Sequence, residues 1–131
     1  SLYELVLKSS KDDATLMNNY AYSIAERPQV TFRQLWYARQ LSRKSLKLNP
    51  DNAAFLDTYG WIAYRLKWYR TAGRYISRSL EIRPDHPVVL EHQAEVYLNM
   101  GKPDQAEDYF KRAERARQQE SATVVRTTED E

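Results

Sequence analysis

The chain has 131 residues, of which 42% are hydrophobic and 29% are charged, and it contains no cysteine. This composition indicates a folded domain with its own core, and it excludes disulfides, thiolate catalysis and cysteine metal ligands. No apolar run approaches the roughly 18 residues that a membrane-spanning helix needs. The opening stretch, SLYELVLKSSKDD, has the character of a helix end, and it leads us to expect a fragment of a longer protein.

The net charge of +2 hides a strong segregation of charge along the chain. Residues 27–84 contain twelve Lys and Arg against three acidic residues, whereas residues 85–131 contain six basic and eleven acidic residues. The middle of the chain is therefore basic and its last third is acidic. Such a basic segment either forms a solvated outer face or meets an acidic partner, an anionic membrane surface or nucleic acid.

In chain order, the first predicted helix contains NNYAY, residues 18–22, and ends before Pro28. Thr31 is a favoured N-cap residue, so the second predicted helix starts directly after it. Residues 53–86 then contain two runs of apolar residues at helical spacing, one around Gly60 and one around Ala72. These runs predict a pair of helices.

Proline and glycine mark the boundaries of the last two predicted helices. Pro84 ends the helix before them, and Pro87 begins the next one as a favoured first residue. Gly101 marks a turn, and Pro103 begins the final helix. The end of the chain lacks helical periodicity, so residues 120–131 are predicted to be a disordered C-terminal tail.

The chain repeats itself with a period of 34 residues. KSLKLNPDNAAFLDTYGW aligns without a gap on RSLEIRPDHPVVLEHQAE, so that Pro50 falls on Pro84 and Asp51 on Asp85. This period, carried by helix–turn–helix units with small residues at fixed places, resembles the tetratricopeptide repeat. The resemblance implies an all-α solenoid of about three repeats with an N-terminal helix remnant. The single domain would span residues 1–119, with repeats at about 14–52, 53–86 and 87–119.

Gly60 lies inside an apolar helical run, where glycine costs about 1 kcal/mol relative to alanine. The resemblance assigns Gly60 and Ala72 to the positions at which the two helices of a repeat cross in close contact. Ala21 and Ala38 take these positions in the first unit, which carries a five-residue insertion near Pro28. A larger side chain at Gly60 would separate the two helices.

The chain offers few groups for catalysis. Its two histidines, His86 and His92, lack the third ligand that a metal site needs. Neither a nucleophile elbow nor a glycine-rich phosphate loop occurs among its three glycines. We therefore predict no enzymatic activity, no cofactor and no metal site.

In the tetratricopeptide-repeat family, the first helix of each repeat lines a concave surface that binds partner segments. Carried over, this predicts a groove of Asn18, Asn19, Tyr22, Asp57, Thr58, Trp61, Tyr64, Arg65, Glu91, His92 and Glu95. Its aromatic and acidic groups favour a neutral or basic segment over a peptide carboxylate. Trp61 is the expected exposed anchor, whereas Tyr64 either faces the groove or packs between repeats.

The sequence thus indicates a non-catalytic scaffold that binds a protein or peptide segment in its concave groove. The alternative is an electrostatic binder of nucleic acid or another polyanion through the basic stripes of the middle segment: Arg39, Arg43, Lys47, Arg70, Arg74 and Arg78. Nucleic acid and membrane are the less favoured partners. We also expect self-association through an apolar N-terminal edge formed by Leu2, Leu5, Val6 and Leu16.

Overall fold

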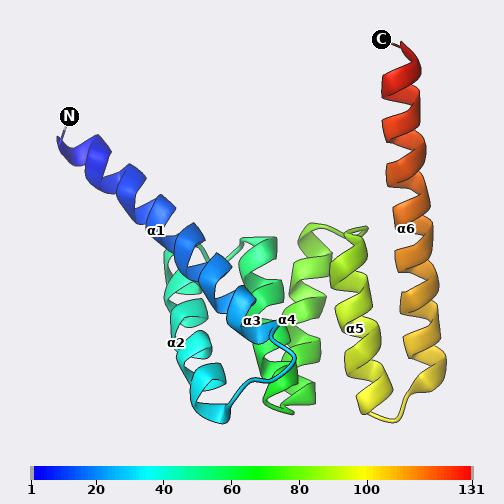
Figure 1. Cartoon of the computed structure of the whole chain (residues 1–131), viewed down its shortest axis with the longest axis horizontal. Coiled ribbons are helices and arrows are strands. Elements are labelled where there is room, and N and C mark those ends of the chain that lie inside the picture. Colours follow the sequence, from blue (N-terminus) through cyan, green and yellow to red (C-terminus); the bar gives the residue numbers. More distant parts are fainter. Residues whose placement is uncertain (1, 131) are drawn as a thin grey trace.

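The computed structural model describes the backbone of residues 2–130 and the side chains of residues 12–126. Over this range the chain forms six helices: α1 (Leu2–Ala25), α2 (Phe32–Leu48), α3 (Ala53–Arg65), α4 (Tyr69–Ile82), α5 (Pro87–Asn99) and α6 (Pro103–Asp130). The most extensive contacts join α1 to α2, α3 to α4 and α5 to α6, and the three pairs stack side by side (Figure 1). The predicted all-α solenoid is confirmed.

The N-terminal segment and the first helix of the array form one continuous helix, α1, from Leu2 to Ala25. The expected N-terminal remnant is therefore joined directly to the first repeat. At the start of α2, the Thr31 hydroxyl accepts from the Gln34 backbone N–H at 3.1 Å, and the Gln34 side chain accepts from the Thr31 N–H at 2.9 Å. This reciprocal capping box confirms the predicted start of α2.

The turns between α3 and α4 and between α5 and α6 share one backbone feature. Lys67 has a φ of 67° and Gly101 a φ of 73°, and the two residues lie 34 positions apart. Glycine adopts this left-handed region freely, whereas a residue with a side chain does so at a cost. The repeat therefore imposes the same turn even where the sequence lacks a glycine.

Gly60 lies at the closest approach of α3 and α4. A Cβ atom at this position would lie 2.7 Å from Ile76 Cγ1 and 3.1 Å from the backbone oxygen of Ala72. The corresponding alanines of the first pair, Ala21 and Ala38, are fully buried. The crossing that the repeat predicts is confirmed, and it explains why α3 contains a residue of low helix propensity.

Two buried serines tie the second helix of a pair to the start of the first. Ser45 Oγ donates to the Ala14 carbonyl at 2.9 Å, and Ser79 Oγ donates to the Ala53 carbonyl at 2.7 Å. The two serines lie 34 residues apart, and the same position in the third pair is Ala113. The first two pairs therefore share a polar tie that the third pair lacks.

The C-terminal part of α6 corrects the prediction of a disordered tail at residues 120–131, because the helix continues to Asp130. No glycine or proline follows Pro103, and an existing helix extends without a new nucleation step. The side chains of residues 117–126 are exposed, and this part of α6 extends beyond the other helices (Figure 1). The boundary of a single domain at residue 119 stays a prediction.

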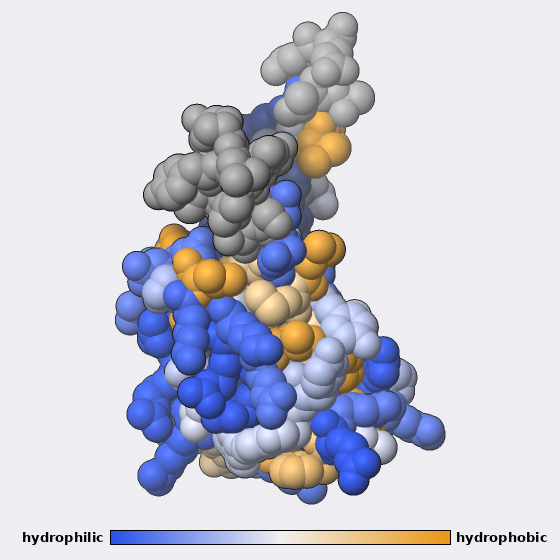
Figure 2. Space-filling view, turned by 90° about the vertical axis from the view of Figure 1, so that its left-hand side faces the viewer, coloured by the Kyte–Doolittle hydropathy of each residue, from blue (hydrophilic) through white to orange (hydrophobic). Residues whose placement is uncertain are grey.

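Large hydrophobic side chains are exposed at the α1–α2 end of the array. Leu16, Tyr20, Phe32 and Tyr37 all belong to this group. Figure 2, which faces this end, shows hydrophobic residues in orange between hydrophilic ones. Of the residues expected to mediate self-association, Leu16 is exposed, while the side chains of Leu2, Leu5 and Val6 lie outside the described residues. Self-association through this end stays a prediction.

Two glycines inside helices test the packing argument, because their surroundings differ. A Cβ atom at Gly73 would meet only Val96 Cγ1, at an ordinary 3.7 Å. We expect Gly73→Ala to raise the free energy of unfolding by up to about 1 kcal/mol through helix propensity. Gly60→Leu should lower it by about 1–3 kcal/mol through overpacking against Ile76. Urea unfolding followed by circular dichroism measures both, and an unchanged stability of Gly60→Leu would contradict the close crossing.

Candidate partner-binding groove

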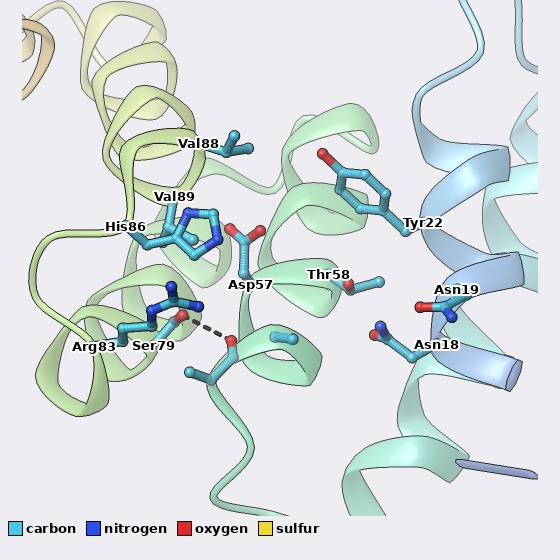
Figure 3. A pocket seen from close by; sticks show the side chains of 12 residues that line it. Asn18, Asn19, Tyr22, Asp57, Thr58, Ser79, Arg83, His86, Val88 and Val89 are labelled. Carbon is cyan, nitrogen blue, oxygen red and sulfur yellow. Dashed lines mark hydrogen bonds between the residues drawn. The ribbon is translucent and has the colours of Figure 1, made fainter. Parts of the chain in front are cut away.

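A pocket of about 320 Å³ lies between α1, α3 and the start of α5, and we call it the α1/α3/α5 pocket. Figure 3 shows Asn18, Asn19 and Tyr22 of α1 on one side of it, with Asp57 and Thr58 of α3 in the middle. The other side is formed by the end of α4 and the start of α5. Its residues there are Ser79, Arg83, His86, Val88 and Val89.

Two residues that line this pocket each carry a buried polar atom without a hydrogen-bond partner within residues 12–126: Asn18 Oδ1 and His86 Nδ1. Asn18 is only 6% exposed. His86 is the N-cap residue of α5 but makes no cap bond, whereas Asn52, 34 positions earlier, accepts from the Phe55 N–H at 3.1 Å. A buried polar atom without a partner costs about 1–3 kcal/mol, so a ligand that bonds to it gains that energy.

Asp57 and His92 form the central polar contact between α3 and α5. His92 Nδ1 lies 2.9 and 3.1 Å from the two carboxylate oxygens of Asp57, and both residues are buried. The sequence assigns both side chains to partner binding. In the structure they bind each other and join the first helices of adjacent repeats.

The aromatic side chains of the groove also pack on one another. Trp61 stacks on His92 with ring centroids 3.9 Å apart and on Tyr64 at 4.6 Å. Trp61 is half-buried, and its indole nitrogen is buried without an acceptor among the described side chains. This corrects the expectation of a freely exposed anchor, because the ring is already part of the α3–α5 contact. The Tyr64 hydroxyl accepts from Asn99 Nδ2 at 3.0 Å, which favours packing between repeats for this residue.

Arg65 holds the end of the first helix. Its guanidinium donates to the backbone oxygens of Ala25 and Arg27, each at 2.9 Å. The last carbonyls of a helix lack partners within the helix. Arg65 satisfies one of them, that of Ala25, together with the Arg27 carbonyl of the following turn, and so joins the first repeat to the second. Its donors are therefore engaged within the array.

The groove around Tyr22 lies in a negative electrostatic field. Burial raises the pKa of the Tyr22 phenol well above its usual value, and a hydrogen bond to Glu26 and the charges of Glu26, Asp57 and Glu91 act in the same direction. Burial, followed by the charge of Glu95, also raises the pKa of Tyr64. These groups favour a cation over an anion near the Tyr22 hydroxyl.

The eleven predicted groove residues fall into three sets. Asn18, Asn19, Tyr22, Asp57 and Thr58 line the α1/α3/α5 pocket. Trp61, Glu91, His92 and Glu95 border a separate depression of about 400 Å³ between α5 and α6, where Glu91 also accepts from Arg117 Nε at 2.7 Å. Tyr64 and Arg65 line neither depression.

The sequence did not single out the α4–α5 side of the pocket. One feature pointed to it: His86 occupies an N-cap position for which the preceding repeat uses Asn52, a good capping residue. Arg83 and Ser79 reach the pocket from the end of α4, which the family pattern of first-helix positions leaves out.

Within residues 12–126, no three His, Asp or Glu side chains gather in a way that would hold a metal ion. None of the helices in the described part of the chain combines the length and apolar character needed to cross a membrane.

Comparisons with known proteins agree with this geometry. The tetratricopeptide-repeat family model matches residues 89–120. Over 83 residues, or 63% of the chain, the sequence is 39% identical to TPR repeat-containing protein PA4667 of Pseudomonas aeruginosa. A structure of MamA superposes with a TM-score of 0.63 at 18% identity, covering 68% of this chain and 52% of MamA. A MamA mutant gives a TM-score of 0.65 at 22% identity, covering 86% and 81%.

The 34-residue period and the stacked helix pairs are those of a tetratricopeptide-repeat solenoid, and residues 89–120 match the family model of this repeat. Arrays of this family are protein–protein interaction scaffolds and in general non-catalytic. The chain spans only 13% of the length of the Pseudomonas relative that it matches.

The buried Asp57–His92 contact generates a stability prediction. Removing one partner leaves the other polar group buried and unpaired, so Asp57→Ala should lower the free energy of unfolding by about 1–3 kcal/mol. Glu95→Ala, on the neighbouring helix, should change it by no more than about 0.5 kcal/mol, because the Glu95 carboxylate forms no ion pair within residues 12–126. Chemical unfolding of the two variants compares them. Equal stabilities would show that Asp57 is a free groove residue.

Proposed function

We propose that the chain holds a short, extended segment of a partner protein in the groove of α1, α3 and α5. The segment seats one or two residues in the α1/α3/α5 pocket. The observation that carries this proposal is that Asn18 and His86, on two sides of the same pocket, each carry a buried polar atom without a partner within residues 12–126. An N–H or O–H group of the partner segment donates to the Asn18 oxygen.

The size and lining of the pocket support a peptide ligand. Its volume of about 320 Å³ is at the lower end of the range of about 300–1,000 Å³ in which ligand pockets fall. Ala53, Ala54, Val88 and Val89 contribute apolar surface beside the polar atoms. This combination suits a side chain with an apolar body together with the backbone amides that flank it.

The charges of the groove favour a neutral or basic segment. Glu26, Asp57 and Glu91 all raise the pKa of Tyr22, so a cationic side chain of the partner gains energy near that hydroxyl. Arg83 lies on the opposite side of the pocket from Tyr22 (Figure 3). The cationic part of the segment therefore points toward α1.

The alternative function is binding of nucleic acid or another polyanion through the basic side chains of α2 and α4. Arg43, Lys47 and Arg78 border a depression beside Tyr59 and Tyr75, away from the α1/α3/α5 pocket. Contact with phosphates releases counterions, so polyanion binding weakens steeply as salt rises. Binding of a neutral segment in the pocket responds far less.

A variant that fills the pocket tests the proposed function. Ala54 is exposed and lines the pocket, so Ala54→Phe should block the segment while leaving the core unchanged. We expect at least a tenfold loss of affinity for a retained partner peptide, measured by isothermal titration calorimetry, with an unchanged melting temperature. Ala122→Phe, the same change at an exposed position of α6, is the matched control and should bind as the unaltered chain does.

The partner peptide for this experiment comes from affinity capture with the unaltered chain, followed by mapping of the retained protein to its binding segment. If Ala54→Phe retains that peptide and charge reversal at Arg43 and Lys47 releases it, the pocket is not the binding site and the polyanion alternative replaces it.

A further inference from the structure

Gly73 lies inside α4 without a reason in the packing of the described residues. Glycine in a helix costs about 1 kcal/mol relative to alanine, and at Gly60 the close contact with Ile76 explains that cost. At Gly73 a Cβ atom would meet only Val96, at 3.7 Å, so the described residues leave room for a side chain. A small residue on a helix surface lets another backbone approach closely. At Gly73, α5 reaches the backbone through Gln93 Nε2, which donates to the Gly73 carbonyl at 3.3 Å, but the place of a Cβ atom stays unfilled.

Gly73 lies in a groove between α4 and α5 with a volume of about 690 Å³, larger than the α1/α3/α5 pocket. We call it the α4/α5 groove. Val96, Tyr97 and Met100 of α5 and its C-terminal end line it together with Gly73. The groove therefore has an apolar floor at the place where α4 lacks a side chain.

Basic side chains surround this floor. Arg70, Arg74, Arg78 and Lys102 line the groove, and Glu81 is the one acidic residue among the side chains that do so. The three arginines are exposed, and none forms an ion pair with an acid within residues 12–126. They follow one another every four residues, about 6 Å apart along the axis of α4, so their charges repel.

We propose that the α4/α5 groove binds an acidic amphipathic helix of a second protein. Its apolar face packs on Gly73, Tyr97 and Met100, and carboxylates spaced four residues apart pair with Arg70, Arg74 and Arg78. The proposal concerns a different surface from the α1/α3/α5 pocket and goes beyond the proposed function.

Two observations favour a helix of a protein over a nucleic acid. Tyr97 and Met100 are only partly buried, so the floor gains energy from packing against aliphatic side chains of the partner, which a phosphate backbone does not supply. The arginine spacing equals the spacing of residues i and i+4 on a helix that runs alongside α4. Gly73 allows this helix to approach as closely as α3 and α4 approach at Gly60.

Synthetic helical peptides serve as probes. One peptide carries leucines on one face and a glutamate every fourth residue beside them, and its matched peptide carries glutamine in place of each glutamate. We expect the glutamate peptide to bind the full chain at least tenfold more tightly than the glutamine peptide in low salt, measured by fluorescence anisotropy. Equal affinities would overturn the proposal.

Variants of the chain locate the binding site. Arg74→Glu with Arg78→Glu should reduce the affinity for the glutamate peptide at least tenfold, and Gly73→Leu should do the same by filling the floor. Gly73→Ala shows by its melting curve that α4 accepts a side chain at this position. Arg126→Glu, an exposed charge reversal on α6, and Ala54→Phe in the α1/α3/α5 pocket should both leave the affinity unchanged. Should Gly73→Leu fail to fold, the paired arginine variant decides alone.

Other occupants of the groove give distinct results. A single-stranded DNA oligonucleotide that binds more tightly than the glutamate peptide, with the same dependence on Arg74 and Arg78, would replace the helix with a polyanion. Association of the chain with itself in sedimentation, lost in the paired arginine variant, would make a second copy the occupant. Either result overturns the proposal.

Discussion

The structure depends on how closely the two helices of a unit approach each other. At Gly60 the space that a single Cβ atom would need is already filled by Ile76 and the Ala72 carbonyl. This short separation brings Ser79 within 2.7 Å of the Ala53 carbonyl at the other end of the pair. The same separation determines how far α3 projects from its unit, and hence where Asp57 meets His92 of the next one.

The contacts within a repeat could be predicted from the sequence, whereas the contacts between repeats could not. Gly60, Ala72, Ala21 and Ala38 mark the helix crossings because two helices can approach closely only where their side chains are small. The side-chain contacts between the first helices of neighbouring repeats depend on the rotation between these repeats. The 34-residue period carries no information about that rotation. Trp61 therefore fits the groove pattern and yet stacks on His92.

The end of the chain shows a similar limit. Val124, Val125 and the neighbouring threonines have modest helix propensity, so local composition alone predicts no helix there. The rest of α6 has already formed, however, and each added residue then gains a hydrogen bond without a nucleation cost. His86 could not be assigned to the pocket from the sequence either. Its assignment depends on two structural observations: its side chain makes no cap bond to α5, and its buried Nδ1 has no hydrogen-bond partner within residues 12–126.

The two grooves of the molecule differ in the chemical groups that a ligand must supply. The α1/α3/α5 pocket contains buried polar atoms without partners among residues 12–126, so it favours a ligand that supplies hydrogen bonds of defined geometry. The α4/α5 groove is lined by four basic side chains and a single acidic one, so it favours a ligand that supplies opposite charge over a longer surface. One repeat array thus offers two surfaces with different selectivity.

The serine ties have a consequence for how the array opens. Ser45 and Ser79 each close a hydrogen bond within their pair, but the third pair has Ala113 at that place. Among residues 103–126, α6 buries only the small side chains of Ala106, Ala113 and Ala116. In a linear array the stability of each unit adds to that of its contacts with its neighbours, so units can detach one at a time from an end. The backbone amides of α6 should therefore exchange their hydrogens with solvent sooner than those of α3 and α4, which places the weakest cooperative unit of the array at its C-terminal end.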